Sequence, residues 1–207
     1  MILAKKILDS SKIKQIFSII ANFKCLIKKA RKSMKKFVFW VIFAGFFAGS
    51  ANADSLYFMP YNAKEAVNAL VSEIKGAKKE VKIAIYSFTN REIAKAIRDS
   101  AKRGVRFKII FDKKQNIDDL YSQIGYLAKL KNIEVCTLQG KNNGKYSGIM
   151  HNKIALIDNK TVAFGSANWS KSAFEVNYEM MIISQNQSYV AQISGYLNRM
   201  LQECKAF

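Results

Sequence analysis

The sequence contains few of the residue types that most often build metal sites or divide a chain into domains. Its 207 residues include one histidine, three cysteines and one proline. A single histidine with scattered cysteines provides no ligand set for zinc, so we expect no bound metal. The only proline, Pro60, lies near residue 54, and no proline-rich linker follows it. We therefore expect a single domain from residue 54 onward.

Acidic residues are also scarce. The chain has 15 Asp and Glu against 34 Lys and Arg, a formal charge of +19. Residues 1–53 contain 11 of the basic residues and one of the acidic ones, which leaves 23 and 14, or +9, for residues 54–207. A basic surface suits a polyanionic partner, either nucleic acid or an anionic lipid surface.

Long apolar runs are missing, but a short one lies within residues 34–53. Met34-Lys35-Lys36 precedes the apolar or small residues 37–49, and an Ala51-x-Ala53 cleavage site follows. This order is typical of a secretory signal peptide. The run is shorter than the roughly 20 residues that span a bilayer. We expect residues 54–207 to be exported, to the periplasm or the medium.

Residues 1–33 form an unusually long extension before this signal. We interpret them as a product of an over-extended reading frame, with Met34 as the true start. The alternative is a basic amphipathic helix that lies on an anionic membrane and keeps the protein membrane-associated. The exported part has two cysteines, Cys136 and Cys204, which can pair in an oxidising compartment. Cys136 can equally be a buried thiol in an apolar strand.

Helical and strand patterns alternate along the exported part, with Thr89 and Glu92 forming a predicted capping box. The alternation predicts a mixed α/β fold with a mostly parallel sheet and helices on both faces. Helices are expected at 62–75, 89–104, 117–130 and 187–203, and strands at 81–87, 106–112, 133–138, 154–157, 161–166 and 178–184.

The only histidine, His151, begins the segment that carries most of the chemistry. Lys153 lies two residues later, so both side chains share one face of a strand. A two-residue turn at Asn159-Lys160 would place Lys153 opposite Ser166 and His151 opposite Asn168. A three-residue loop would shift this pairing by one residue. Such a polar cluster suits an anion, although a histidine at a strand start can also be purely structural.

The complete pattern from His151 to Asn168 is H-x-K-x(4)-D-x(6)-G-S-x-N. It resembles the signature of the phospholipase D superfamily and matches it at every specified position. Glu179 occupies the place where the small bacterial nucleases of this superfamily carry a glutamate that orients the catalytic histidine. The resemblance implies a phospholipase D-like catalytic domain over residues 54–207, with one motif per chain and no cofactor.

The resemblance also implies a homodimer with one shared active site. Larger members of the superfamily carry the motif twice, and we find no second H-x-K here. In the small members, two copies associate about a two-fold axis and each supplies one motif. His151 of one subunit would then be the nucleophile that forms a phosphohistidine, and His151 of the partner subunit would be the general acid.

The other motif residues receive supporting roles by the same resemblance. Lys153 and Asn168 would hold the phosphate oxygens, and Ser166 would be a hydrogen-bond partner. Glu179 would bind the far imidazole nitrogen. Asp158 belongs to the signature, but we expect it to be structural and to hold the turn.

Residues outside the motif give weaker signals for substrate binding. Lys141 and Lys145 lie in a Gly- and Asn-rich loop that can grip a phosphate backbone, or be an ordinary solvated loop. Lys113-Lys114 is a second such pair. Trp169 and Tyr146 flank the motif and are candidates for stacking on bases. For Trp169 we favour a place in the core.

We expect an exported, metal-independent endonuclease of DNA, RNA or both, with little sequence preference. One alternative is a phospholipase D or cardiolipin hydrolase, because the same site handles any phosphodiester. The other is an inactive nucleic-acid-binding protein used in DNA uptake.

Overall fold

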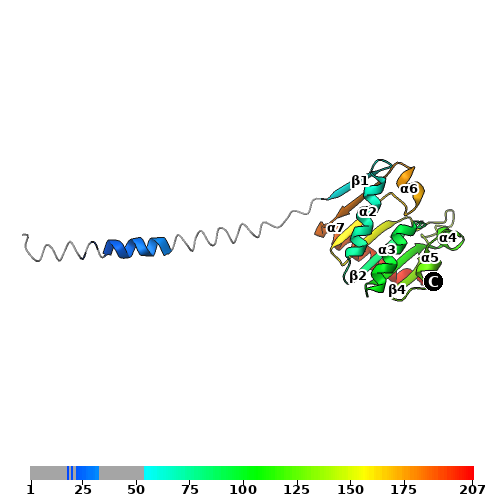
Figure 1. Ribbon diagram of the computed structural model, residues 1–207. Coiled ribbons are helices and arrows are strands. Elements are labelled where there is room, and N and C mark those ends of the chain that lie inside the picture. The colour runs from blue at the N-terminus through cyan, green and yellow to red at the C-terminus, as the bar shows by residue number, and fades with distance from the viewer. Residues whose placement is uncertain (1–17, 19, 21, 33–53) are drawn as a thin grey trace, which may run out of the picture. The chain divides into compact units, whose positions relative to one another are not determined.

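The structure, a computed structural model, describes residues 18, 20, 22–32 and 54–207 in two separate parts (Figure 1). In the first part the described residues are helical, with Phe23 and Leu26 exposed. The expected signal peptide at 34–53 lies outside the described residues. No helix in the described ranges combines the length and apolar character needed to cross a membrane.

Residues 54–207 form one sheet with the strand order β1-β7-β6-β5-β2-β3-β4-β8. Among these pairings only β2–β3 and β3–β4 are parallel, and the other five are antiparallel. The expectation of a mostly parallel sheet is therefore wrong. The loop of three residues that joins β5 to β6 is too short for the helical crossover that parallel neighbours require. The strands are β1 (Ser55–Met59), β2 (Glu80–Ile85), β3 (Arg106–Asp112), β4 (Ile133–Leu138), β5 (Lys153–Ile157), β6 (Thr161–Gly165), β7 (Glu179–Ser184) and β8 (Lys205–Ala206).

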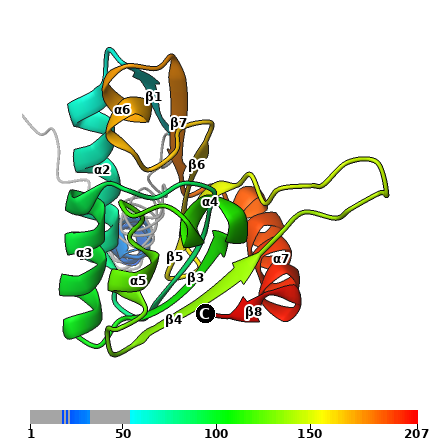
Figure 2. The same cartoon turned by 90° about the vertical axis from the view of Figure 1, so that its right-hand side faces the viewer.

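Helices cover both faces of the sheet, as the mixed α/β prediction requires (Figure 2). On one face the larger core lies beneath α2, α3, α5 and α6, and on the other a smaller core lies beneath α7. Each core-facing helix buries residues at helical spacing; in α3 these include Ile93, Ile97 and Ala101. The helices are α2 (Ala63–Gly76), α3 (Arg91–Lys102), α4 (Lys113–Ile117), α5 (Ile124–Leu127), α6 (Lys171–Glu175) and α7 (Gln187–Glu203).

Two helix predictions need correction. The N-cap of α3 is Asn90, whose side chain accepts hydrogen bonds from the backbone N–H groups of Glu92 and Ile93, and the predicted capping box at Thr89 is wrong. The predicted helix at 117–130 is replaced by α4, a turn and α5. In the turn, the Asp119 carboxylate accepts a hydrogen bond from the backbone N–H of Tyr121, and such local bonds compete with a helix.

The β5–β6 hairpin has a three-residue loop, so the predicted register is wrong by one residue. Ile157 pairs with Thr161, and Lys153 consequently faces Gly165 instead of Ser166. Asp158 and Asn159 adopt positive φ values of 50° and 53°, a left-handed conformation that Asp and Asn tolerate better than most residues. The hydrogen bond from Lys160 N to Ile157 O closes the turn.

Cys136 and Cys204 form a disulfide with a Cα–Cα distance of 5.8 Å. The bond joins β4 to the residue that follows α7, and β8 then pairs with β4. It resolves the choice that the sequence left open between a disulfide and a buried thiol. The C-terminal end of the chain is thereby fixed to the sheet.

Candidate active site

The topology brings the motif to one edge of the sheet. β5 is antiparallel to β2, so the start of β5 lies beside the end of β2. β7 is antiparallel to β6, so the start of β7 at Glu179 lies beside the end of β6 at Gly165. The ends of β2, β3 and β6 and the starts of β5 and β7 therefore meet at the edge that carries His151.

The backbone around His151 is fixed by two hydrogen bonds. Met150 N donates to the buried carboxylate of Asp112 at 2.9 Å, and Tyr86 N donates to Asn152 O at 2.8 Å. The His151 imidazole is exposed and meets the Tyr86 ring edge-on, with a centroid distance of 4.5 Å. The imidazole is thus held in place while one side stays open to a substrate.

Lys153 is a buried cation at the same edge, with 5% of its surface exposed. Its Nζ donates to His151 O at 2.9 Å and lies 5.1 Å from the centre of the Tyr86 ring. Burial lowers the pKa of Lys153, and the negative charge of Glu179 opposes that change. An ammonium has three donors, so it can bind a phosphate oxygen in addition to this carbonyl.

The electrostatic environment favours a neutral His151. Burial, followed by the positive charge of Lys153, lowers the pKa of His151, while Asp112 and Glu179 oppose the shift. Only the neutral imidazole has a free lone pair, which is the form that can attack phosphorus. The structure joins Lys153 to His151 by a hydrogen bond, and the charge of Glu179 at the start of β7 acts on both, but no hydrogen bond joins the Glu179 carboxylate to either side chain among the described residues.

Ser166 connects the end of β6 to the start of β7. Its Oγ accepts a hydrogen bond from Met180 N at 3.1 Å, and its own N donates to Met180 O at 3.0 Å. These two bonds fix the residue that follows Glu179. Ser166 therefore helps to position the start of β7, where Glu179 lies.

Asn168 has a buried Oδ1 without a hydrogen-bond partner, the only such side-chain atom among the residues that the structure describes. An unpaired buried polar atom costs stability and calls for an explanation. The next residue, Trp169, is 3% exposed and packs edge-on against Phe88, with ring centres 5.0 Å apart. Trp169 belongs to the core, so the hypothesis that it stacks on bases is wrong.

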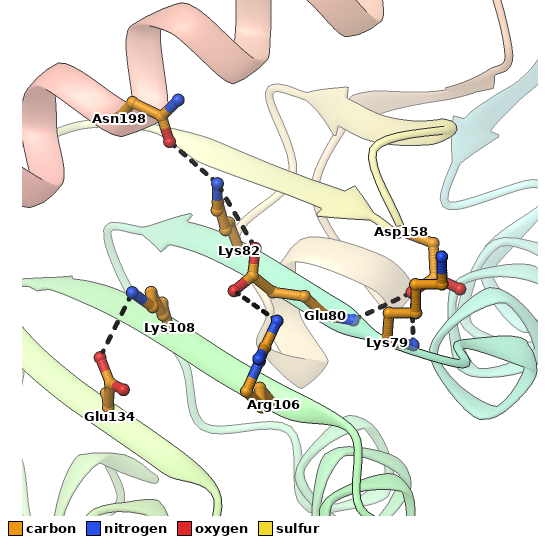
Figure 3. A network of polar contacts seen from close by, with 8 residues as sticks. All are labelled: Lys79, Glu80, Lys82, Arg106, Lys108, Glu134, Asp158 and Asn198. Carbon is orange, nitrogen blue, oxygen red and sulfur yellow. Dashed lines mark hydrogen bonds and ion pairs between the residues drawn. The ribbon is translucent and has the colours of Figure 1, made fainter.

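Asp158 lies at the opposite end of β5 from His151, and the structure does not bring it to the other motif residues. Its carboxylate accepts hydrogen bonds from the backbone N–H groups of Lys78, Lys79 and Glu80 at 2.7, 2.8 and 3.0 Å. Figure 3 shows the bonds from Lys79 and Glu80. Burial raises the pKa of Asp158, but these donors lower it by more. Asp158 thus anchors the hairpin to the start of β2, which agrees with a structural role.

The basic residues predicted outside the motif separate into two groups. Lys141 lines a hollow of about 440 Å³ together with His151 and Arg199, and Lys114 lines another of about 450 Å³ with Tyr86. Lys145 lies farther along the loop between β4 and β5, which projects from the domain in Figure 2, and its Nζ is 5.5 Å from the centre of the Tyr146 ring. Lys141 and Lys114 are the better placed.

Sequence reasoning missed Tyr86 and Asp112. Tyr86 supplies the ring against which His151 and Lys153 pack, and Asp112 holds the backbone immediately before His151. The available signal was their position, since each is a polar side chain where an apolar strand ends at the carboxyl edge.

A further hollow of about 520 Å³ lies beside His151, between the sheet and α7. Most of its lining is apolar and includes Ile154, Phe164, Ile182 and Ile193. Around the motif, as elsewhere in the described residues, no three His, Cys, Asp or Glu side chains converge to form a metal site.

Comparison with known proteins gives consistent results. Residues 70–201 match the family model described as "Cardiolipin synthase, PLD-like domain". NucT from Helicobacter pylori is 46% identical, with a TM-score of 0.72, over 75% of this chain and 99% of that one. Nuc from Salmonella typhimurium, a phospholipase D family member, is 26% identical, with a TM-score of 0.63, over 75% of this chain and 97% of that one.

Mitochondrial cardiolipin hydrolase from Xenopus laevis is 25% identical over 138 residues, which are 67% of this chain and 62% of that relative. The chain therefore spans about three fifths of this curated relative. The family match covers more than half of the chain and includes the whole His151 motif. The chain belongs to the phospholipase D-like domain family.

Proposed function

We propose that this protein is an exported, metal-independent endonuclease that cleaves DNA, RNA or both with little sequence preference. The observation that carries the proposal is the exposed His151 imidazole beside the buried Lys153 ammonium at one open sheet edge, with both packed against the Tyr86 ring. A neutral imidazole beside a cation supplies a nucleophile and charge stabilisation for a phosphodiester.

The proposed reaction has two steps. A nitrogen of His151 attacks phosphorus and the bond to the leaving oxygen breaks, while His151 of the partner subunit gives that oxygen a proton. Water then gives a proton to the partner subunit's His151 and attacks phosphorus, and the phosphorus–nitrogen bond breaks. Lys153 and Asn168 from both subunits hold the non-bridging oxygens.

The chain's single imidazole requires the second subunit in this scheme. A histidine bonded to phosphorus cannot protonate the leaving oxygen in the same step. A two-fold axis brings identical edges together, so a symmetric dimer supplies the missing acid. The unpaired Oδ1 of Asn168 fits a site that is completed by further groups.

The positive charge and the similarity to NucT and Nuc support a nucleic acid substrate. Residues 54–207 carry a formal +9, and Lys114 and Lys141 flank the edge that holds His151. The chain also matches NucT and Nuc over nearly their whole lengths. The chain also resembles the small members of the superfamily that carry a single motif, and those are nucleases.

The strongest rival function is hydrolysis of a phospholipid. The apolar hollow of about 520 Å³ beside His151 can take part of an acyl chain, and the similar mitochondrial protein is named a cardiolipin hydrolase. The catalytic residues do not separate the two substrates, because both contain a phosphodiester.

A side-by-side digestion in EDTA tests the proposal. Residues 54–207, produced with the disulfide intact, are given single-stranded DNA, duplex DNA, RNA and cardiolipin vesicles, with His151→Ala as the matched control. We expect nucleic acid to be cut by the unsubstituted protein alone. Release of phosphatidic acid with intact nucleic acid would support the lipid alternative. Salt-sensitive binding without any cutting would indicate the inactive binding protein.

A further inference from the structure

A second hollow lies on the helical face of the domain, away from the His151 motif. Its volume is about 410 Å³, within the range of ligand pockets, and it separates α3 from the segment 120–126. One wall carries cations that recur every three to four residues along α3, and the other carries exposed apolar and aromatic side chains. The first group is Arg91, Lys95 and Arg98, and the second is Leu120, Tyr121 and Tyr126.

Two of the three cations are available to a ligand. Arg98 is paired with Asp99 at 2.7 Å. Arg91 and Lys95 are exposed and take part in none of the ion pairs found among the described residues. Within the described part of the chain, no Asp or Glu lines this hollow. Its positive charge therefore favours an anionic ligand.

The aromatic wall is unusually exposed. Tyr121 keeps 75% of its surface accessible and Tyr126 keeps 40%, and Leu120, at the start of this wall, is 97% exposed. Cations beside exposed aromatic rings are the combination with which proteins hold unpaired nucleic acid, phosphates on the cations and bases on the rings. Exposed rings are otherwise costly, because they leave apolar surface in water.

We propose that this hollow, which we call the α3 groove and define by Arg91, Lys95, Tyr121 and Tyr126, binds a single-stranded segment that flanks the scissile phosphate. The inference rests on the proposed nuclease function and adds a substrate preference to it. Bases can stack on the tyrosines only when they are free of a duplex.

Hydrogen bonds connect the α3 groove to the catalytic edge. Ser122, in the groove's aromatic wall, donates from Oγ to Asn116 Oδ1 at 2.9 Å. Asn116 Nδ2 in turn donates to Tyr86 O at 2.6 Å. The Tyr86 ring contacts the imidazole of His151. Both walls of the groove also begin after the ends of β2 and β3, so a strand that crosses His151 can continue into the groove along the same end of the domain.

Binding is measured in the His151→Ala background, so that the oligonucleotide stays intact. The fluorescence anisotropy of a labelled single strand is followed against salt concentration. Arg91→Ala/Lys95→Ala should reduce the slope of log K against log salt by about 1.4, because each lost phosphate contact on a single strand contributes about 0.7. Tyr121→Ala should weaken single-strand binding about fivefold or more, and Tyr121→Phe should retain it.

Matched controls separate the groove from overall charge. Lys78→Ala/Lys79→Ala removes the same charge at the opposite edge of the sheet, and it should leave the slope unchanged. Tyr121→Ala should leave binding of a dinucleotide and of a duplex unchanged. An equal reduction of the salt slope in both double variants, or unaltered single-strand binding by Tyr121→Ala, would contradict the proposal that the α3 groove binds a single strand.

The two proposals fail in distinguishable ways. Cleavage in EDTA together with unaltered binding by the groove variants would overturn the α3 groove and leave the proposed function standing. The predicted binding losses without cleavage by the unsubstituted protein would overturn the nuclease and leave the groove as a binding site.

Discussion

At the scale of residues, the chemistry depends on how burial and three charges act on one imidazole. Burial and Lys153 lower the pKa of His151, and Asp112 and Glu179 raise it. Because the chain has no other histidine, its imidazole gives a single set of proton resonances that can be titrated directly.

Glu179→Gln should lower the pKa of His151 further. The substitution removes a negative charge that favours the imidazolium, so the neutral form persists to lower pH. The acidic limb of kcat/KM should move in the same direction. An NMR titration of the imidazole C2 proton measures the shift. Glu175→Gln, at an exposed surface pair with Lys171, is the matched control and should leave the pKa unchanged. A raised pKa in Glu179→Gln would contradict the account.

The motif residues could be predicted because their spacing is contained in one short segment. Tyr86 and Asp112 could not, since they come from β2 and β3, far upstream, and reach His151 only through strand pairing. Trp169 is a residue for which sequence position alone was misleading. Its position beside the motif suggested a role with substrate, whereas its burial against Phe88 is decided by tertiary packing.

At the scale of elements, Asp158 secures the hairpin that begins with the active-site residues. Its folded pKa is held low, so its contribution to stability is present above the unfolded value of about 3.9 and is lost as the pH falls through the folded pKa. The three N–H donors that it accepts belong to the start of β2.

Asp158→Asn should therefore destabilise the domain by about 1–3 kcal/mol at neutral pH, because three backbone N–H donors lose a charged acceptor. The difference from the unsubstituted protein should shrink as the pH is lowered. Urea unfolding across that pH range measures both effects. The exposed Asp118→Asn is the control, and kcat/KM should stay unchanged in both variants. A loss of activity in a stable Asp158→Asn protein would show a catalytic role instead.

The disulfide should contribute strongly to stability, since it closes a loop with a sequence separation of 68 residues. Chain entropy predicts that Cys136→Ala/Cys204→Ala lowers the free energy of unfolding by about 4 kcal/mol. Denaturant unfolding with and without dithiothreitol checks this value. The reductant should destabilise the unsubstituted protein and leave the variant unaffected. A midpoint that is insensitive to reductant in both would contradict the prediction.

Most elements could be predicted from periodicity, but their pairing could not. The helices α2 and α7 and the strands from β2 to β7 follow their apolar patterns. The hairpin register depended on one extra loop residue, which positive φ angles at Asp158 and Asn159 accommodate. The edge strands β1 and β8 were not predicted, because each gains its partner only in the folded sheet and β8 is only two residues long.

At the scale of the whole molecule, the sequence predicted a basic, exported domain, and the fold places one copy of the motif at one edge of its sheet. Residues 54–207 form a compact unit with one exposed imidazole. Export, the start at residue 54 and the homodimer stay predictions. Mass spectrometry of the protein recovered outside the cytoplasm tests the first two. Absence of the protein from that fraction would contradict export, and an intact Met1 would contradict the start at residue 54.

The central claim is that one phosphate is cleaved by two imidazoles, each from a different subunit. Differently tagged chains allow a mixed dimer of the unsubstituted protein and His151→Ala to be purified and assayed on nucleic acid in EDTA. Because the nucleophile and the acid are both required, its kcat should fall by at least about a hundredfold relative to the unsubstituted dimer. Half of the unsubstituted activity would show that each chain works alone and would contradict the shared site.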